Sequence, residues 1–224
     1  MIDLSKSYDF FAPESVRERI HIVGCGSVGA TLAENLVRLG LTKITLYDFD
    51  KVSPHNLANQ IFRQQDIGVP KVDALKDILM QINPDIEKDL KIKPAGWQGE
   101  KMSGYIFLAV DNIDLRRQIV EQHMDNAFVR GVFDWRTLLT GAQHYAADWS
   151  SILDKKALMN SMAFSHEEAA VETPVSACGV TLGVAPTVRA ICALGVANFL
   201  NFAKGGELKK LILLDVFDFT LEAY

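Results

Sequence analysis

The segment IVGCGSVG restricts the fold more than any other part of the chain. Its glycines, Gly24, Gly26 and Gly29, have the spacing GxGxxG and stand between an apolar run at 19–23 and a segment at 27–39 with helical periodicity. In such a unit the first glycine allows a tight turn, the second lets a phosphate approach the backbone, and the third lets the helix pack on the strand. The pattern predicts a nucleotide-binding strand–turn–helix; a glycine-rich turn without a ligand is the alternative.

Short apolar runs and helical segments alternate along the chain. The segments expected to be strands are 19–23, 43–47, 106–110, 128–133 and 140–146. The segments expected to be helices are 27–39, 69–82, 112–123 and a weaker one near 153–164. This alternation is typical of an α/β fold, and it predicts a Rossmann-like, mostly parallel sheet with helices on both faces.

The remaining segments complete a single domain over residues 1–224, with an N-terminal arm at 1–19. The longest apolar region, 179–203, is interrupted by polar residues and proline, so its unbroken part is shorter than the roughly 20 residues that span a bilayer. We expect a buried helix there, no membrane contact, and antiparallel edge strands in KKLILLDVFDFTLEAY after it. Residues 148–178 are polar, and we interpret them as a crossing segment that could be mobile.

Composition narrows the function classes. The net charge of −5 argues weakly against a nucleic-acid or membrane-surface binder, so both partners are unlikely on this ground. Three cysteines, Cys25, Cys178 and Cys192, cannot all pair and form no CxxC unit. We therefore expect a reducing, cytoplasmic location and no thiolate zinc site. The N-terminal MIDLSKSYDFF lacks the apolar core of a signal peptide.

Acidic residues follow the second expected strand. Asp48 lies 19 residues after Gly29, where an acidic residue holds the ribose hydroxyls in dinucleotide-binding folds. A turn or helix-cap aspartate is the alternative, and Asp50 is a second, less certain candidate. These features alone fit an NAD-dependent dehydrogenase as well as any other enzyme.

The next stretch, NLANQIFRQQDIGVPK, separates these possibilities. It spaces an amide at Asn56 and cationic groups at Arg63 and Lys71. A dinucleotide site has no need of this set, whereas a site that handles a triphosphate could use it. Lys71 suits phosphate oxygens as a point charge, and a cation at a helix N-terminus is otherwise poorly placed.

The region TLYDFDKVSPHNLANQIFRQQDIGVPK resembles the adenylating enzymes of thiamine and molybdenum-cofactor biosynthesis, the ThiF/MoeB family, and their relatives that activate ubiquitin-like proteins. That family carries DxD, then NLxRQ, then DIGxxK, and DNxxxR after a later buried strand. The resemblance covers about 20–146 and resumes at 178. The matching positions are Asp48, Asp50, Asn56, Leu57, Gln60, Asp66, Ile67, Gly68, Lys71, Asp111, Asn112 and Arg116.

The resemblance implies a role for several of these residues in adenylation. That reaction joins a carboxylate to the α-phosphate of ATP and expels pyrophosphate, so charge on the leaving group must be neutralised. By resemblance, Asp48 holds the ribose, Asn56 and Lys71 hold phosphates, and Asp111 organises Mg²⁺. A carboxylate at the end of a buried strand suits both the ligand crevice and this cation. We expect Arg116 to be structural.

Two departures from the family pattern stand out. Asn59 replaces the arginine of NLxRQ and cannot offer its charge, but its amide is still expected to lie in the nucleotide site. Arg63 could contact phosphate in place of the missing arginine. The family's N-terminal RYxRQ element, whose arginine reaches the ATP of a neighbouring subunit, is also missing. Arg17 and Arg19 are basic but crowded against the first strand, which puts a trans arginine in doubt.

A cysteine shortly before the last long helix is a feature of the bacterial relatives, and Cys178 stands there. A thiol near a helix N-terminus has a lowered pKa, so Cys178 could receive the activated carboxyl; a small buried residue is the alternative. Cys25 and Cys192 are expected to be core. The chain lacks the two CxxC pairs of the family's structural zinc, so none is expected.

These observations predict an ATP-dependent adenylyltransferase that activates the C-terminal carboxylate of a small ubiquitin-like or sulfur-carrier protein, with ATP and Mg²⁺. The family habit, and the small residues of the last helix, favour a homodimer. One alternative is an RNA-linked or small-molecule carboxylate as substrate. Another is a nucleotide-binding member that has lost catalysis, motivated by Asn59. The DIGxxK and DNxxxR motifs disfavour an NAD dehydrogenase.

Overall fold

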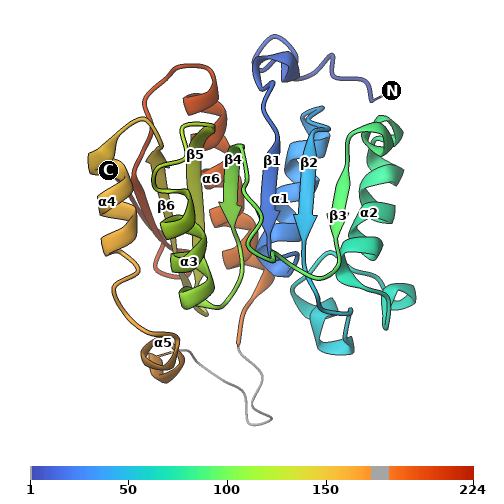
Figure 1. The fold of residues 1–224 in the computed structure, drawn as a ribbon. Helices are drawn as coiled ribbons and strands as arrows, with labels where there is room; N and C mark the ends of the chain where they lie inside the picture. Colours follow the sequence, from blue (N-terminus) through green and yellow to red (C-terminus); the bar gives the residue numbers. More distant parts are fainter. Residues whose placement is uncertain (1, 173–181) are drawn as a thin grey trace.

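All strands of the computed structural model, which describes residues 2–172 and 182–224, join one eight-stranded sheet (Figure 1). The strand order is β3-β2-β1-β4-β5-β6-β7-β8. The first five strands in this order run parallel to one another, and each of the last three is antiparallel to the strand before it. The prediction of a mostly parallel sheet with antiparallel C-terminal strands is confirmed.

Most expected elements are present with small shifts at their ends. The strands are β1 Ile20–Val23, β2 Ile44–Tyr47, β3 Lys91–Lys93, β4 Gly104–Leu108, β5 Val129–Thr137, β6 Gly141–Asp148, β7 Leu211–Asp215 and β8 Thr220–Ala223. The α-helices are α1 Ser27–Arg38, α2 Lys71–Ile82, α3 Ile113–His123, α4 Ile152–Asn160, α5 His166–Glu172 and α6 Ala185–Ala203. The sequence patterns missed β3 and α5, because β3 is a three-residue KIK edge strand and α5 lies in the polar crossing segment.

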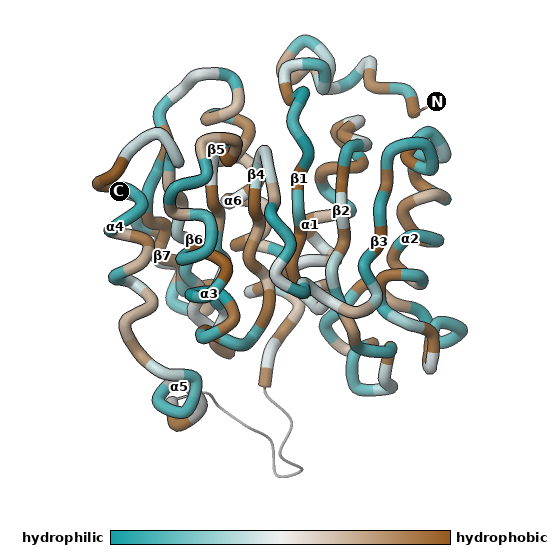
Figure 2. The backbone as a smooth tube through the Cα atoms, in the orientation of Figure 1, coloured by the Kyte–Doolittle hydropathy of each residue, from teal (hydrophilic) through white to brown (hydrophobic). Residues whose placement is uncertain are grey.

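Helices cover both faces of the sheet. Alternate residues of each central strand face opposite cores. In β4, Phe107 belongs to the core that includes residues of α1, α2 and α6, while Leu108 belongs to the core that includes residues of α3 and α4. Both side chains are fully buried. In Figure 2 hydrophobic residues concentrate along the central strands, which matches strands that are buried on both faces.

The apolar helix α6 packs within the chain, as expected. It is the one helix in the described residues that is long and apolar enough to cross a membrane, yet half of its most apolar window is buried inside the protein. Its Gly195 lies against Trp135, where an added Cβ would be 2.2 Å from the indole Nε1. At least this small residue is therefore explained by packing inside the chain, and the homodimer stays a prediction.

Candidate functional site

Three parallel strands end side by side at the carboxyl edge of the sheet, the lower edge in Figure 1. The glycine turn follows β1, Asp48 follows β2, and Asp111 lies three residues beyond the end of β4. Because β2 and β4 flank β1 in the sheet, the chain folds these three sequence-predicted features onto one edge. This edge is where ligands bind in open parallel sheets.

Each glycine of the turn answers a different steric demand. Gly24 has a φ of +94°, and a Cβ there would lie 2.7 Å from the carbonyl carbon of Ala109. At Gly29 a Cβ would lie 1.8 Å from the Gly24 oxygen, so the helix can approach the turn only without a side chain. At Gly26, in contrast, a Cβ would meet nothing within 4 Å. Gly26 therefore leaves open space at the start of α1, where free N–H groups and the helix dipole favour an anion.

Asp48 ties the end of β2 to this turn. Its carboxylate accepts hydrogen bonds from the backbone N–H of Cys25 at 2.6 Å and of Asp50 at 2.8 Å. Burial raises the pKa of Asp48, while these two N–H donors and the charge of Lys71 oppose that rise. The carboxylate thus has the turn role that was the alternative for it, and the ribose contact stays a prediction.

Lys71 provides a positive charge next to the acidic residues that follow β2. It begins α2, its backbone N–H donates to the Asp50 carbonyl, and its Nζ donates to Asp50 Oδ2 at 2.8 Å. The Lys71 side chain is 9% exposed whereas that of Asp50 is 51% exposed. A buried ammonium at a helix N-terminus needs a counter-charge, and Asp50 supplies one that solvent can reach.

The amides and the arginine of the next stretch are already engaged. Asn56 is buried, and its Oδ1 accepts the backbone N–H of Ser53 at 2.8 Å. Asn59 Nδ2 donates to the Gly183 carbonyl at 3.2 Å, just before α6. Arg63 grips Asp66 through Nε at 3.0 Å and Nη2 at 3.1 Å.

Arg63 also donates from Nη1 to Gln81 Oε1 at 3.1 Å, which aims its guanidinium along α2. A phosphate contact by Arg63 would require it to leave these partners, so that contact stays a prediction. A nucleotide contact by Asn59 also stays a prediction, because its amide donates a hydrogen bond to the segment before α6.

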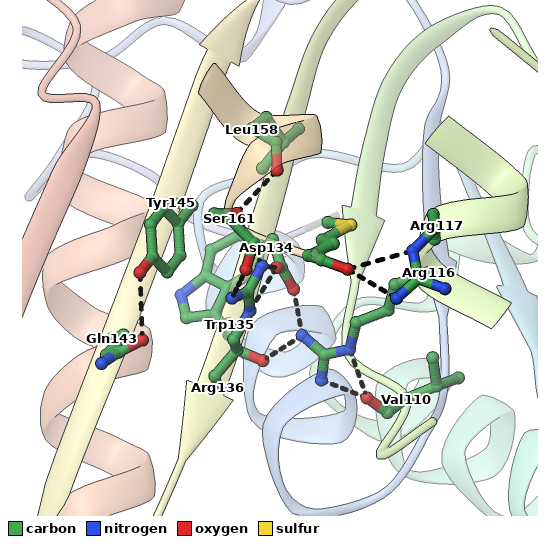
Figure 3. Close-up of polar contacts among 11 residues, drawn as sticks. Val110, Arg116, Arg117, Asp134, Trp135, Arg136, Gln143, Tyr145, Leu158 and Ser161 are labelled. Carbon is green, nitrogen blue, oxygen red and sulfur yellow. Dashed lines mark hydrogen bonds and ion pairs between the residues drawn. The ribbon is translucent and has the colours of Figure 1, made fainter. Parts of the chain in front are cut away.

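Asp111 is exposed, while the residues around it support the backbone. Asn112 Oδ1 caps α3 by accepting the N–H of Leu115 at 2.9 Å. Arg116 is buried and donates from Nε to the Val110 carbonyl at 2.7 Å, as Figure 3 shows. Burial lowers the pKa of Arg116, and the charge of Asp134 opposes this. The structural role expected for Arg116 is confirmed.

The arginines that precede β1 lie at the opposite edge of the sheet. Arg19 Nη1 donates to the carbonyls of Ile44, at 3.0 Å, and Asp89, at 2.8 Å, beside the amino ends of β2 and β3. Arg19 is therefore a structural anchor and does not reach the glycine turn of its own chain.

Two of the three cysteines are core residues, as expected. Cys25 and Cys192 are fully buried, and burial raises the pKa of both thiols. Cys178 lies outside the described residues. Among the residues that the structure describes, no three His, Cys, Asp or Glu side chains gather into a group that could hold a metal by themselves.

Asp134 and Arg136 were missed by sequence reasoning. Asp134 is fully buried on β5 and contacts the guanidinium groups of both Arg116 and Arg136. Two charged residues in the otherwise apolar segment VFDWR could have signalled a buried ion pair, because charges are almost never fully buried without a partner.

The comparison with known families decides the identity of the fold. A model of the ThiF family matches residues 14–219. This chain belongs to the ThiF family. It is 28% identical, over 201 residues, to the molybdopterin-synthase adenylyltransferase of Haemophilus influenzae, an alignment that covers 85% of this chain and 79% of that enzyme.

A second relative matches a shorter part of this ThiF-family chain. The ubiquitin-like modifier-activating enzyme 5 of Caenorhabditis elegans is 39% identical over 75 residues, which cover 33% of this chain. That match spans only 18% of the length of the C. elegans enzyme.

Solved structures show the same fold at low sequence identity. PaaA superposes with a TM-score of 0.71 at 17% identity, covering 99% of this chain and 68% of PaaA. Escherichia coli MccB with ATP superposes with a TM-score of 0.69 at 16% identity, covering 95% of this chain and 64% of MccB.

Proposed function

We propose that this chain is an ATP-dependent adenylyltransferase that activates the C-terminal carboxylate of a small ubiquitin-like or sulfur-carrier protein. One observation carries the proposal: an open glycine turn, the Lys71–Asp50 ion pair and the exposed Asp111 share one edge of the sheet. The named adenylyltransferase and activating-enzyme relatives support this activity.

In the proposed reaction a carboxylate oxygen attacks the α-phosphorus of ATP. The bond from that phosphorus to the oxygen that bridges to the β-phosphate breaks, and pyrophosphate leaves with the electron pair. The backbone N–H groups at the start of α1 would receive phosphate oxygens beside Gly26. Lys71, which now donates to Asp50, would exchange this partner for a phosphate oxygen and oppose the developing charge.

Asp111 fits a role as ligand of Mg²⁺. Its carboxylate is exposed at the edge where phosphates would lie, and this cation is usually held by one or two carboxylates together with phosphates and water. When bound there, Mg²⁺ would supply charge neutralisation on the leaving pyrophosphate.

A nucleotide-binding member without catalysis is the second candidate. Asn59 stands at the position of the family arginine without its charge, and Arg63, which could supply that charge, is bound to Asp66. Activation of an RNA-linked or small-molecule carboxylate would use the same chemistry on another acceptor. A homodimer and a cytoplasmic location remain parts of our proposal.

Exchange of labelled pyrophosphate into ATP tests the activity directly. The small protein encoded nearest to this chain is the first substrate to try, with the same protein shortened by two C-terminal residues as the control. We expect exchange with the intact carboxyl tail and none with the shortened one. A thermal shift with Mg·ATP, and none with NAD, is expected as well. Binding of Mg·ATP without exchange for any carboxylate tested would favour the non-catalytic reading, and no binding would overturn both.

We propose in addition that Cys178 acts after adenylation. Because Cys25 and Cys192 are fully buried, rapid alkylation by iodoacetamide near pH 7 should report on Cys178. We expect Cys178→Ser to abolish rapid alkylation but to keep pyrophosphate exchange. If peptide mapping finds the label on Cys25 or Cys192 instead, the role of Cys178 is wrong and the protein stops at the adenylate.

A further inference from the structure

Asp134 lies at the centre of a buried ion network near the carboxyl end of β5. Its side chain is 0% exposed, and it has two guanidinium partners. Oδ1 accepts a hydrogen bond from Arg116 Nη1, while Oδ2 accepts one from Arg136 Nε at 2.8 Å and pairs with Arg136 Nη2 at 2.7 Å. The two carboxylate oxygens thus point in different directions, each to its own arginine (Figure 3).

One arm of the network leads to the candidate site. Arg116 donates from Nε and from Nη2 to the carbonyl of Val110, and from Nη1 to the carbonyl of Trp135 at 2.8 Å. Val110 immediately precedes Asp111. The guanidinium therefore holds the backbone that carries Asp111 against β5, with the rigid planar geometry that distinguishes arginine from lysine.

The other arm leads to the end of α4. Arg136 Nη1 donates to the Ser161 carbonyl at 2.7 Å and Nη2 to the Ser161 hydroxyl at 2.9 Å. Ser161 is the C-cap of α4, where a cation also complements the helix dipole. The Arg136 guanidinium lies 4.4 Å above the ring of Tyr145, which restrains it further.

Stability alone is a poor explanation for this arrangement. Buried ion pairs often contribute no more to stability than well-packed apolar residues of similar volume, because both charges lose their hydration. Here one carboxylate serves two guanidinium groups, and Asp111 is a further charge that acts on Arg116. What an apolar cluster could not supply is a directional connection between two backbone segments that lie 51 positions apart, Val110 and Ser161.

We propose that Asp134 is a positioning residue that couples the loop carrying Asp111 to the C-terminal end of α4. Through Arg116 it sets where the Asp111 backbone lies, and through Arg136 it ties that loop to the crossing segment. The importance of this for catalysis rests on the proposed function, whereas the coupling itself is a property of the folded chain.

Hydrogen–deuterium exchange of the full chain without nucleotide tests the coupling. Arg136→Met keeps the neutral Arg116–Asp134 pair, so this variant should fold. We expect exchange at least about threefold faster in peptides 158–165 and also in peptides 109–116. The matched control is Asp154→Asn, which removes another buried carboxylate that pairs with Lys210 at 2.6 Å. It should loosen α4 and leave peptides 109–116 unchanged.

Asp134→Asn should accelerate exchange in both segments more than Arg136→Met does. Faster exchange only at 158–165 in the Arg136→Met variant would overturn the proposal, whatever the stability of the Asp134 variant. As a second readout, Arg136→Met should raise the Mg²⁺ concentration for half-maximal pyrophosphate exchange while the KM for ATP stays unchanged. If the wild type shows no exchange activity, the proposed function fails and the deuterium result still decides the coupling.

Discussion

The ion pair on the β1–β2 side of the carboxyl edge has one partner that solvent reaches, Asp50, whereas the carboxylate of the ion network on the β4–β5 side, Asp134, is sealed in the protein. Asp50, which pairs with Lys71, is about half exposed. Asp134, which pairs with Arg116 and Arg136, is fully buried. An exposed partner can be exchanged for a ligand at a cost of roughly 1 kcal/mol or less, but breaking a buried pair costs several kcal/mol.

This difference separates binding from support. In our proposal, the side of the edge that releases a partner for a phosphate keeps only the carboxylate of its ion pair, Asp50, at the surface. The side that has to keep a loop in place uses buried carboxylate–guanidinium bonds in fixed directions. Asp111 lies between these two sides of the edge. Its side chain is exposed, while Arg116 binds the carbonyl of the preceding residue, Val110.

The largest expected effect on pyrophosphate exchange comes from changing Asp111. Asp111→Ala should lower pyrophosphate exchange at least about a thousandfold, because it removes the proposed ligand of Mg²⁺. The exposed Asp125 at the end of α3 offers a matched control, and Asp125→Ala should leave the exchange rate unchanged. Wild-type exchange by the Asp111 variant would show that the metal, or its role, lies elsewhere.

Lys71 tests the open side of the comparison. Lys71→Ala should lower the exchange rate by about a hundredfold or more, equivalent to about 3 kcal/mol of transition-state stabilisation. Arg63→Ala should cost less, because Arg63 is bound to Asp66 and Gln81 in the structure. Lys76→Ala, on the same helix, is the control for charge alone.

Equal losses for the Lys71 and Arg63 variants would show that Arg63 leaves Asp66 and takes over the role of the missing family arginine. No loss for a folded Lys71→Ala would contradict adenylation at this edge. The first result would place the Arg63–Asp66 pair among the ion pairs that can be exchanged for a ligand, and the second would remove the Lys71–Asp50 pair from them.

The glycines of the turn allow a test that separates packing from ligand space on the open side. Gly29→Ala should lower the free energy of unfolding by about 2–3 kcal/mol, because its Cβ would lie 1.8 Å from the Gly24 oxygen. Gly26→Ala should have nearly the same free energy of unfolding as the wild type, because nothing lies within 4 Å of a Cβ added there. It should, however, lose the thermal shift with Mg·ATP. Similar destabilisation in both variants would mean that Gly26 serves the fold as well.

The open side was largely predictable from the sequence and the sealed side was not. The glycine spacing, the two aspartates after β2 and Lys71 act through local turns and neighbouring strands, so their spacing along the chain carries the signal. Asp134 acquires its meaning only from partners on α3 and at the end of α4.

The same physical reason explains why the predicted end of β5 was wrong. The strand that became β5 was expected to end at residue 133, directly before the charged residues Asp134 and Arg136. Their charges are neutralised inside the fold, so the strand continues to Thr137. Likewise, the contact of Asn59 with Gly183 spans 124 positions and has no local signature.

The smallest expected effect is the pH dependence of stability that comes from two buried histidines, His21 on β1 and His144 on β6. Burial lowers the pKa of His21 on β1 and of His144 on β6 to about 4, from an ordinary value of 6.5. Between these values the unfolded chain binds more protons than the folded chain, so stability should be complete above about pH 6.5 and fall as the pH drops toward 4. We expect each histidine to account for about 1–2 kcal/mol of that fall.

Urea unfolding at several pH values between 4.5 and 7.5 measures this effect. His144→Phe retains an aromatic ring beside Phe133 and Trp135, and its loss of stability with falling pH should be shallower than that of the wild type. His21→Phe should behave in the same way. Each variant also loses a hydrogen bond, His21 to the Tyr47 hydroxyl at 2.9 Å and His144 to Asn198 Nδ2 at 3.3 Å. If only one variant has the shallower slope, acid destabilises one side of the sheet first. If both curves run parallel to the wild type, the histidines titrate alike in the folded and unfolded chains and their burial is not the source of acid sensitivity.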